Sequence, residues 1–235
     1  MYLSIIIPAY NEEKRIAASL DKIHAYFEGR NVKYEVILVD DGSVDGTVKV
    51  SRKSLLEAEG KLRILSNAKN RGKGFSVRTG ILSSKGEYVL FSDADLSTPI
   101  AEFDTLLDVM AQGYDLVMAS RSVKGSKLKV PQPWYRQTMG RIFNVFVKAL
   151  FFSEYNDTQC GFKLIKGEAA REIALEMKID GFCFDVEMVY LAQKKGYRIK
   201  ETGVVWENSP ESKVTVLNSS LNMFMDLFRI KKCHG

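Results

Sequence analysis

The stretch Glu87-Tyr88-Val89-Leu90-Phe91, with Ser92-Asp93-Ala94-Asp95 after it, decides more about the fold than any other part of the chain. A short, mainly apolar run is typical of a strand buried in a sheet. Asp93 and Asp95 follow it, and side chains two residues apart point the same way while the backbone stays extended. Two such carboxylates repel each other unless a cation lies between them. The pair therefore predicts a site for Mg²⁺ or Mn²⁺, which prefer oxygen ligands and often share them with substrate phosphates.

The first half of the chain alternates predicted strands with predicted helices. Val, Ile and Leu run almost without interruption through the strands, which is typical of a parallel sheet covered on both faces. The pattern predicts a doubly wound α/β layer, in which ligands bind beyond the carboxyl ends of the strands. The predicted strands are residues 3–7, 35–39, 62–65, 88–91 and 116–119, and the predicted helices are residues 12–27, 47–56, 74–84 and 99–111.

A polar segment follows each of these predicted strands. Any one of them has an ordinary alternative, a solvated loop in which Asp residues cap a helix. Their shared position at one edge of the sheet makes a common binding site the better explanation. The segments are residues 8–13, 40–43, 67–74, 93–95 and 120–121.

The composition fits one globular domain, with 235 residues of which 46% are hydrophobic and 27% charged. We divide it into a nucleotide-binding half, residues 1–121, and an acceptor-binding half, residues 122–235. A net charge of +5 suits phosphate-bearing substrates or an anionic membrane surface. Nucleic acid is not expected as a partner, because zinc-finger and RNA-binding patterns are missing.

The chain is expected in the cytoplasm. Its three cysteines are scattered, which indicates a reducing compartment. Residues 1–8 lead directly into a strand without a basic region, which is unlike a signal peptide. No apolar stretch is long enough to span a bilayer.

The second half is less regular. A basic loop is predicted at residues 122–133, a helix at 136–152, a strand at 161–165, a helix at 184–195 and a strand at 197–205.

Two amphipathic segments raise the question of a membrane. Residues 136–152 carry one narrow polar stripe, and residues 221–230 repeat the pattern before Lys231 and Lys232. Basic, aromatic helices of this kind can lie in a bilayer interface. The alternative is that both helices pack on the sheet as core. The stripes consist of Gln137, Arg141, Asn144 and Lys148, and of Asn222, Asp226 and Arg229.

Several motifs occur in an order that resembles a known family. They are Pro8-Ala9-Tyr10-Asn11-Glu12, Asp40-Asp41-Gly42-Ser43-Val44-Asp45-Gly46-Thr47 and Asp93-Ala94-Asp95, followed by Asp157-Thr158-Gln159-Cys160-Gly161-Phe162-Lys163 and Ser212-Lys213. The chain resembles the family 2 glycosyltransferases of GT-A fold, a Rossmann-like, mostly parallel sheet flanked by helices. Within them it is similar to the polyprenyl-phosphate transferases, which include dolichyl-phosphate β-glucosyltransferases and dolichol-phosphate mannose synthases.

The resemblance implies roles for the matching residues. The first motif would line the nucleotide pocket, Asp41 would accept a hydrogen bond from the base, and Asp93 and Asp95 would hold the donor diphosphate through Mg²⁺ or Mn²⁺. Lys73 would hold phosphate or merely solvate its loop. The residues of the nucleotide pocket are Pro8, Ala9, Tyr10, Glu12 and Ala94, and the expected phosphate partners are Arg121, Arg136 and Lys213. Arg121 and Arg136 have an alternative as ordinary surface ion pairs.

The acceptor decides whether a base is needed. A lipid phosphate is already mostly ionised near neutral pH, since its second pKa is about 6, and needs positioning only. Arg121, Arg136 and Lys163 are the candidates for holding it. A hydroxyl acceptor would require a general base, for which Asp185 and Glu187 are the candidates. Asp185 has an alternative as a favourable charge at a helix start.

The sequence therefore predicts an inverting, metal-dependent transfer of glucose from UDP-glucose to a polyprenyl or dolichyl phosphate, by a protein bound peripherally to the cytoplasmic face of a membrane. Mannose synthases often place Gln where this chain has Ser97, and often place Arg where it has residues 207–211. Use of GDP-mannose is the first alternative. A hydroxyl acceptor and a non-catalytic nucleotide-sugar binding protein are the others.

Overall fold

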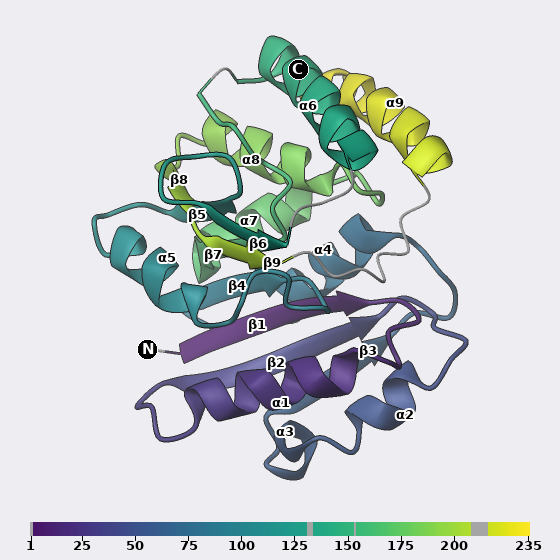
Figure 1. The fold of residues 1–235 in the computed structure, drawn as a ribbon, viewed down its shortest axis with the longest axis vertical. Helices are drawn as coiled ribbons and strands as arrows, with labels where there is room; N and C mark the ends of the chain where they lie inside the picture. The colour runs from purple at the N-terminus through teal and green to yellow at the C-terminus, as the bar shows by residue number, and fades with distance from the viewer. Residues whose placement is uncertain (1, 131–133, 153, 208–215) are drawn as a thin grey trace.

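The computed structural model describes residues 2–130, 134–152, 154–207 and 216–235, with side chains placed except at 130, 134–137 and 216–221. A seven-stranded sheet runs through the molecule in the order β3-β2-β1-β4-β7-β5-β8 (Figure 1). Its strands are β1 (Tyr2–Ala9), β2 (Lys33–Asp40), β3 (Leu62–Ser66), β4 (Tyr88–Ser92), β5 (Leu116–Ser120), β7 (Phe162–Lys166) and β8 (Ile199–Gly203).

The sheet is parallel except at β7. That strand lies between β4 and β5 and is antiparallel to both, with Leu90 opposite Leu164 and Leu116 opposite Ile165. The other pairs are parallel. The predicted mostly parallel α/β layer is therefore confirmed. Because β7 and β8 come from residues 122–235, both halves of the chain build one sheet, and the functional division at residue 121 stays a prediction.

Helices cover both faces of the sheet, as the apolar strands require. One face packs against α1 (Ile16–Phe27), α3 (Leu55–Ala58) and α5 (Glu102–Met110). The other packs against α4 (Lys73–Ser83), α7 (Gly167–Glu176) and α8 (Phe184–Lys194). The two faces form separate apolar clusters, so the sheet is buried from both sides.

Several predicted boundaries are wrong for local reasons. The helix predicted from residue 12 begins only at Ile16, after a turn. The helix predicted at 47–56 is split into α2 (Thr47–Ser51) and α3, because the Ser54 hydroxyl caps α3 by accepting the Glu57 N–H. The helix α7 was not predicted.

A second, two-stranded sheet also departs from the prediction. β6 (Lys127–Val130) lies in the predicted basic loop and pairs in parallel with β9 (Val205–Glu207). The strand predicted at 197–205 is therefore divided between the two sheets.

The helices α6 (Trp134–Leu150) and α9 (Val216–His234) lie side by side over α8, away from the sheet (Figure 1). Phe224 of α9 packs its ring edge-on against Phe143 and Phe146 of α6, with centroids 5.5 and 5.1 Å apart. Among the helices of the described residues, none is long and apolar enough to cross a bilayer.

Candidate functional site

The carboxyl ends of β1 and β2 carry loops that hold each other. The Asn11 N–H donates to Ser43 Oγ at 2.8 Å, and the Glu12 N–H donates to Thr47 Oγ1 at 2.7 Å. The Asp41 N–H donates to the Ala9 carbonyl at 2.8 Å. Two of the motifs singled out in the sequence therefore form one framework at this edge of the sheet. Tyr10 is exposed on this framework, whereas Ala9 is buried in the strand.

Asp41 is buried and anchors the loop after β3. Its carboxylate accepts hydrogen bonds from Asn67 Nδ2 and from the N–H groups of Arg71 and Gly72, at 2.8, 2.9 and 2.8 Å. The structure thus assigns Asp41 to the shape of the loop that precedes Lys73. Its expected contact with a nucleotide base stays a prediction.

Asp93 follows β4 and lies against β7. Its N–H donates to the Gly161 carbonyl at 3.0 Å. A Cβ at position 161 would lie 1.9 Å from Asp93 Oδ2, so only glycine leaves room for this carboxylate. Oδ1 is buried, and the Lys73 ammonium pairs with it at 2.6 Å.

Asp95 is held by a different set of partners. Its Oδ1 accepts the Ser97 N–H at 3.0 Å, and its Oδ2 lies 3.4 Å from Arg15 Nη1. Arg15 also pairs with Glu12 at 2.6 Å, so a guanidinium links the first motif to the acidic motif. Ala94, between the two acids, is buried, and its carbonyl accepts the Ser19 hydroxyl.

These acids suit a hard divalent cation. Their carboxylate oxygens are the ligands that Mg²⁺ and Mn²⁺ prefer, and the buried oxygen of Asp93 already attracts a cation, the Lys73 ammonium. Within the described residues no group of three or more His, Cys, Asp and Glu side chains could hold a metal. A metal at Asp93 and Asp95 would thus depend on the substrate for most of its ligands, which is usual for Mg²⁺.

Lys73 belongs to a row of alternating charges that continues into the interior. Burial disfavours its charged form, but the carboxylates of Asp93 and Asp185 outweigh burial and raise the pKa of the ammonium. Asp185 is buried and pairs with Lys163, which has no exposed surface and also donates to the Cys160 carbonyl at 2.7 Å. Burial raises the pKa of the Asp185 carboxyl, against the opposing effect of Lys163 and Lys73.

This row of charges bears on the expected roles of Lys163 and Asp185. Lys163 was expected to hold the acceptor phosphate, but it is enclosed and already paired with Asp185. Asp185, expected as a base or as a helix-start charge, lies in the first turn of α8 and is also buried. Glu187 accepts the N–H groups of Lys178 and Ile179 and pairs with His234 at 2.7 Å.

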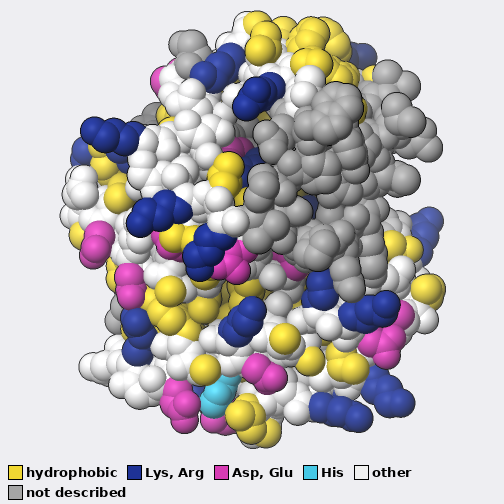
Figure 2. Space-filling view, viewed as in Figure 1, with side chains coloured by type: hydrophobic (Ala, Val, Ile, Leu, Met, Phe, Trp, Pro, Cys, Tyr) yellow, Lys and Arg dark blue, Asp and Glu magenta, His cyan; other side chains and the backbone are white. Residues whose placement is uncertain are grey.

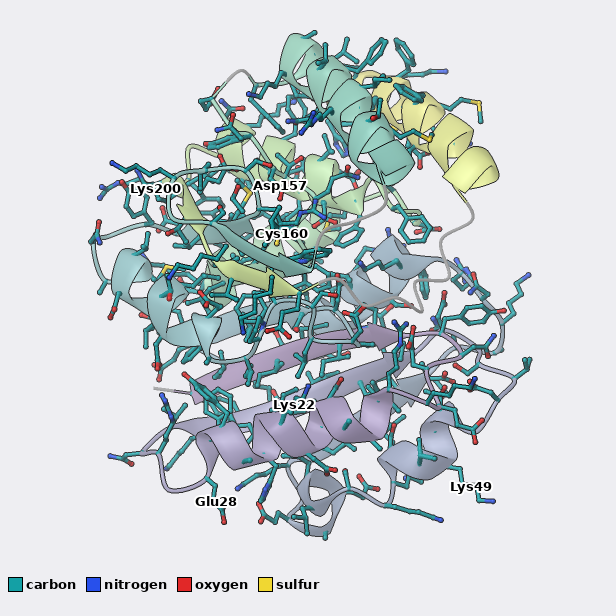
Figure 3. The ribbon with its side chains drawn as sticks, in the orientation of Figure 1. Lys22, Glu28, Lys49, Asp157, Cys160 and Lys200 are labelled. Carbon is teal, nitrogen blue, oxygen red and sulfur yellow. The ribbon has the colours of Figure 1, made fainter. Side chains whose placement is uncertain are left out.

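Arg121 follows β5, as predicted, and forms an ion pair with Asp157. Its Nε and Nη2 donate to the two carboxylate oxygens at 2.7 and 2.8 Å, and its backbone N–H adds a third bond. Burial opposes ionisation of Asp157, but Arg121 outweighs burial and lowers the pKa of that carboxyl. Figure 3 shows Asp157 and Cys160 on the segment that leads to β7. The phosphate-binding role of Arg121 stays a prediction.

Two predicted phosphate partners cannot be placed with their side chains. Arg136 lies in the first turn of α6, where the structure places no side chain, and Lys213 lies outside the described residues. Pro8 is the penultimate residue of β1 and is buried near the carboxyl edge of the sheet.

Sequence reasoning missed Arg15 and the packing role of Gly161. Arg15 stands three residues after Glu12, a spacing that lets the two pair across one turn. Gly161 was part of a quoted motif, but its contact with Asp93 joins residues 68 positions apart in the sequence, which no local pattern indicates.

Comparison with known proteins identifies close relatives. The profile described as glycosyl transferase family 2 matches residues 4–174. The chain is 38% identical over 243 residues to a dolichyl-phosphate beta-glucosyltransferase of Dictyostelium discoideum, covering 98% of this chain and 74% of that protein. It is 35% identical over 241 residues to the dolichyl-phosphate beta-glucosyltransferase of Homo sapiens, covering 97% and 74% of the two chains.

Solved structures share the fold at low identity. Glucosyl-3-phosphoglycerate synthase from Mycobacterium tuberculosis, in complex with Mn²⁺, UDP-glucose and phosphoglyceric acid, superposes with a TM-score of 0.69 at 19% identity, covering 99% of this chain and 79% of that one. Mannosyl-3-phosphoglycerate synthase from Rubrobacter xylanophilus gives 0.69 at 20% identity, covering 99% and 73%.

Proposed function

The chain belongs to glycosyl transferase family 2 and has the GT-A fold, and we propose that it transfers glucose from UDP-glucose to a polyprenyl phosphate such as dolichyl phosphate. The observation that carries the proposal is the environment of Asp93, whose carboxylate lies beside the Lys73 ammonium at the edge of the sheet where the motifs meet. Its relatives named dolichyl-phosphate beta-glucosyltransferase support the choice of sugar and acceptor.

Asp93 and Asp95 would hold Mg²⁺ or Mn²⁺ against the donor diphosphate. When bound, that cation would neutralise the negative charge that develops on the leaving diphosphate. Gly161 leaves room for the Asp93 carboxylate, and Arg15, which is paired with Glu12 of the first motif, orients Asp95. The acceptor oxygen would attack glucose C1 opposite the diphosphate, so that one C1–O bond forms as the other breaks and the configuration inverts.

The acids near the site favour a phosphate acceptor over a hydroxyl. A hydroxyl would need a base within hydrogen-bond reach. Asp185 and Glu187, the candidate bases, are both buried and both occupied by partners on the protein. A phosphate monoester needs no such base, because it is already mostly ionised near neutral pH, its second pKa being about 6.

The α6–α9 pair supports attachment to a membrane surface. Ile142, Val145 and Phe146 of α6 are 45–65% exposed, and Met225 and Phe228 of α9 are 50 and 63% exposed. We call these five side chains the α6–α9 apolar patch. Figure 2 shows hydrophobic side chains gathered with Lys and Arg at this end of the molecule. Large exposed apolar patches mark interaction sites on folded proteins.

The polar stripe of α6 helps to explain this exposure. Asn144 and Lys148 turn toward the protein, where they donate to the carbonyl and the side chain of Asn156 at 2.6 and 2.7 Å. Part of the polar side of α6 therefore faces the protein, and apolar side chains of the helix face the solvent. The exposed Arg141, Lys231 and Lys232 suit the anionic lipids of a cytoplasmic leaflet. We infer a peripheral location on the cytoplasmic face.

A donor and acceptor panel tests the proposal. Purified protein is incubated with UDP-glucose, UDP-galactose, UDP-GlcNAc or GDP-mannose, with dolichyl or undecaprenyl phosphate and Mg²⁺ or Mn²⁺. Glucose-linked lipid is expected from UDP-glucose, and Asp93→Asn or Asp95→Asn should lower its formation at least about 100-fold. Asp104→Asn, which removes an exposed carboxylate paired with Arg30, is the matched control. No lipid-linked product with any donor would refute the proposal, and product from GDP-mannose alone would reassign the sugar.

A further inference from the structure

Lys73 occupies an unusual place for a cation. It is the first residue of α4, where the helix dipole disfavours positive charge. Its ammonium nevertheless lies 2.6 Å from Asp93 Oδ1, a buried carboxylate oxygen. The contact is therefore maintained by charge, against the preference of the helix terminus.

The surrounding structure fixes the backbone before Lys73 and places two aromatic rings near its ammonium. Gly72 has φ of 107°, and a Cβ there would lie 2.3 Å from the Asp180 carbonyl, so the backbone before Lys73 is tightly fixed. The same carbonyl accepts the Gly74 N–H at 2.8 Å. The ammonium lies 5.4 and 5.9 Å from the ring centroids of Phe91 and Phe184, within reach of cation–π attraction.

We propose that Lys73 is a resident counter-ion of Asp93, which competes with the divalent cation until the nucleotide diphosphate arrives. The proposal rests on the proposed function, because it takes Asp93 as a metal ligand. An ammonium and a metal cannot both lie close to the same carboxylate oxygen without strong repulsion. The cation then binds the protein weakly by itself.

The diphosphate relieves the competition. A lysine is a point charge on a flexible stem with three donors, so its ammonium can turn from Asp93 to a phosphate. Asp93 is then left to the metal, and the two ligands bind together. By linkage, the nucleotide and the metal each raise the affinity of the other by the same factor. Lys73 is therefore a positioning residue that makes metal binding depend on the donor.

Binding of Mn²⁺, followed by the electron paramagnetic resonance signal of the free ion, tests this without any turnover. The wild type, Lys73→Met and Lys73→Arg are titrated with MnCl₂, with and without UDP. Met keeps an apolar stem but removes the charge, so Lys73→Met should bind Mn²⁺ alone at least about tenfold more tightly than the wild type. The factor by which UDP raises Mn²⁺ affinity should shrink by about the same amount. Lys73→Arg keeps the charge and should bind Mn²⁺ alone as weakly as the wild type.

Lys166→Met is the matched control. It removes a lysine paired with Asp115 at 2.7 Å, at the opposite end of β7, and should leave Mn²⁺ binding unchanged. Melting curves establish that each variant is folded. If the wild type binds Mn²⁺ with UDP but Lys73→Met gains no affinity for Mn²⁺ alone, the counter-ion role is refuted while the metal site stands. Failure of the wild type to bind Mn²⁺ even with UDP overturns both.

Discussion

Two regions of this molecule depart from the usual distribution of residues, and they do so in opposite directions. At the carboxyl edge of the sheet, charged groups are buried, with Lys163 and Asp185 enclosed beneath Asp93 and Lys73. At the α6–α9 pair, apolar side chains such as Val145 and Phe228 face outward. A buried charge and an exposed apolar patch are the two placements that carry information about function.

The two regions depend on their surroundings in different ways. Buried charges are stabilised only by their partners, so the edge of the sheet depends on every member of its ion pairs. Strongly exposed apolar side chains such as Val145 and Phe228 contribute little to the isolated fold, so they can change without unfolding the protein. Substitutions in the first region should therefore cost stability or activity, and substitutions in the second should cost only attachment to a surface.

Lys163→Met should have the largest effect. It leaves Asp185 buried without its closest cation, and breaking a buried ion pair costs about 3–5 kcal/mol of unfolding free energy. The double variant Lys163→Met, Asp185→Asn removes both charges and should recover part of that loss. Urea denaturation measures both. The partly exposed pair of Lys166 and Asp115 is the control, where Lys166→Met should cost less than about 1 kcal/mol. If Lys163→Met and Lys166→Met lowered the unfolding free energy equally, burial would not determine how much an ion pair contributes to stability.

Gly161→Ala should abolish most activity with a smaller loss of stability. The new Cβ would overlap the Asp93 carboxylate, and the acid would have to move from its place at the edge. We expect kcat/KM for glucosyl transfer to fall about 100-fold, equivalent to about 2.7 kcal/mol of transition-state stabilisation. Gly140→Ala in α6 is the control, because nothing lies within 4 Å of its Cβ. Wild-type rates in Gly161→Ala would show that the position of Asp93 is not critical.

These variants also mark where the sequence was informative. The apolar strands and the polar segments after them predicted the sheet and its functional edge, because both depend on neighbouring residues. The contact of Gly161 with Asp93 and the burial of Lys163 arise only when β7 inserts beside β4. The periodicity of α6 predicted a polar stripe but not its direction, since Asn144 and Lys148 face inward only because Asn156 meets them there.

Asp157→Asn should change the acid dependence of stability. Because Arg121 lowers the pKa of Asp157 in the fold, the pair stabilises the protein above the unfolded carboxyl value of about 3.9. That stability is lost as the pH falls through the lower, folded value, by about 1.4 kcal/mol for each unit of depression. At neutral pH the variant should lose about 1.5–3 kcal/mol, the net contribution of a hydrogen bond to a charged group. Its unfolding free energy should then vary less with pH in acid than that of the wild type, and curves that stay parallel below pH 5 would contradict the role of the pair.

The smallest effect on the fold should come from Val145→Glu. Val145 is 65% exposed on α6, so its replacement should change the unfolding free energy by less than about 0.5 kcal/mol. A carboxylate at that point would resist entry into a lipid interface and repel anionic headgroups, so binding to phosphatidylcholine–phosphatidylserine vesicles should fall about tenfold in flotation.

Leu175→Glu adds the same charge at a 74% exposed position on α7 and should float like the wild type. Equal flotation of all three proteins would mean that the α6–α9 apolar patch meets something other than a bilayer, whereas an equal loss in both variants would assign the effect to net charge alone.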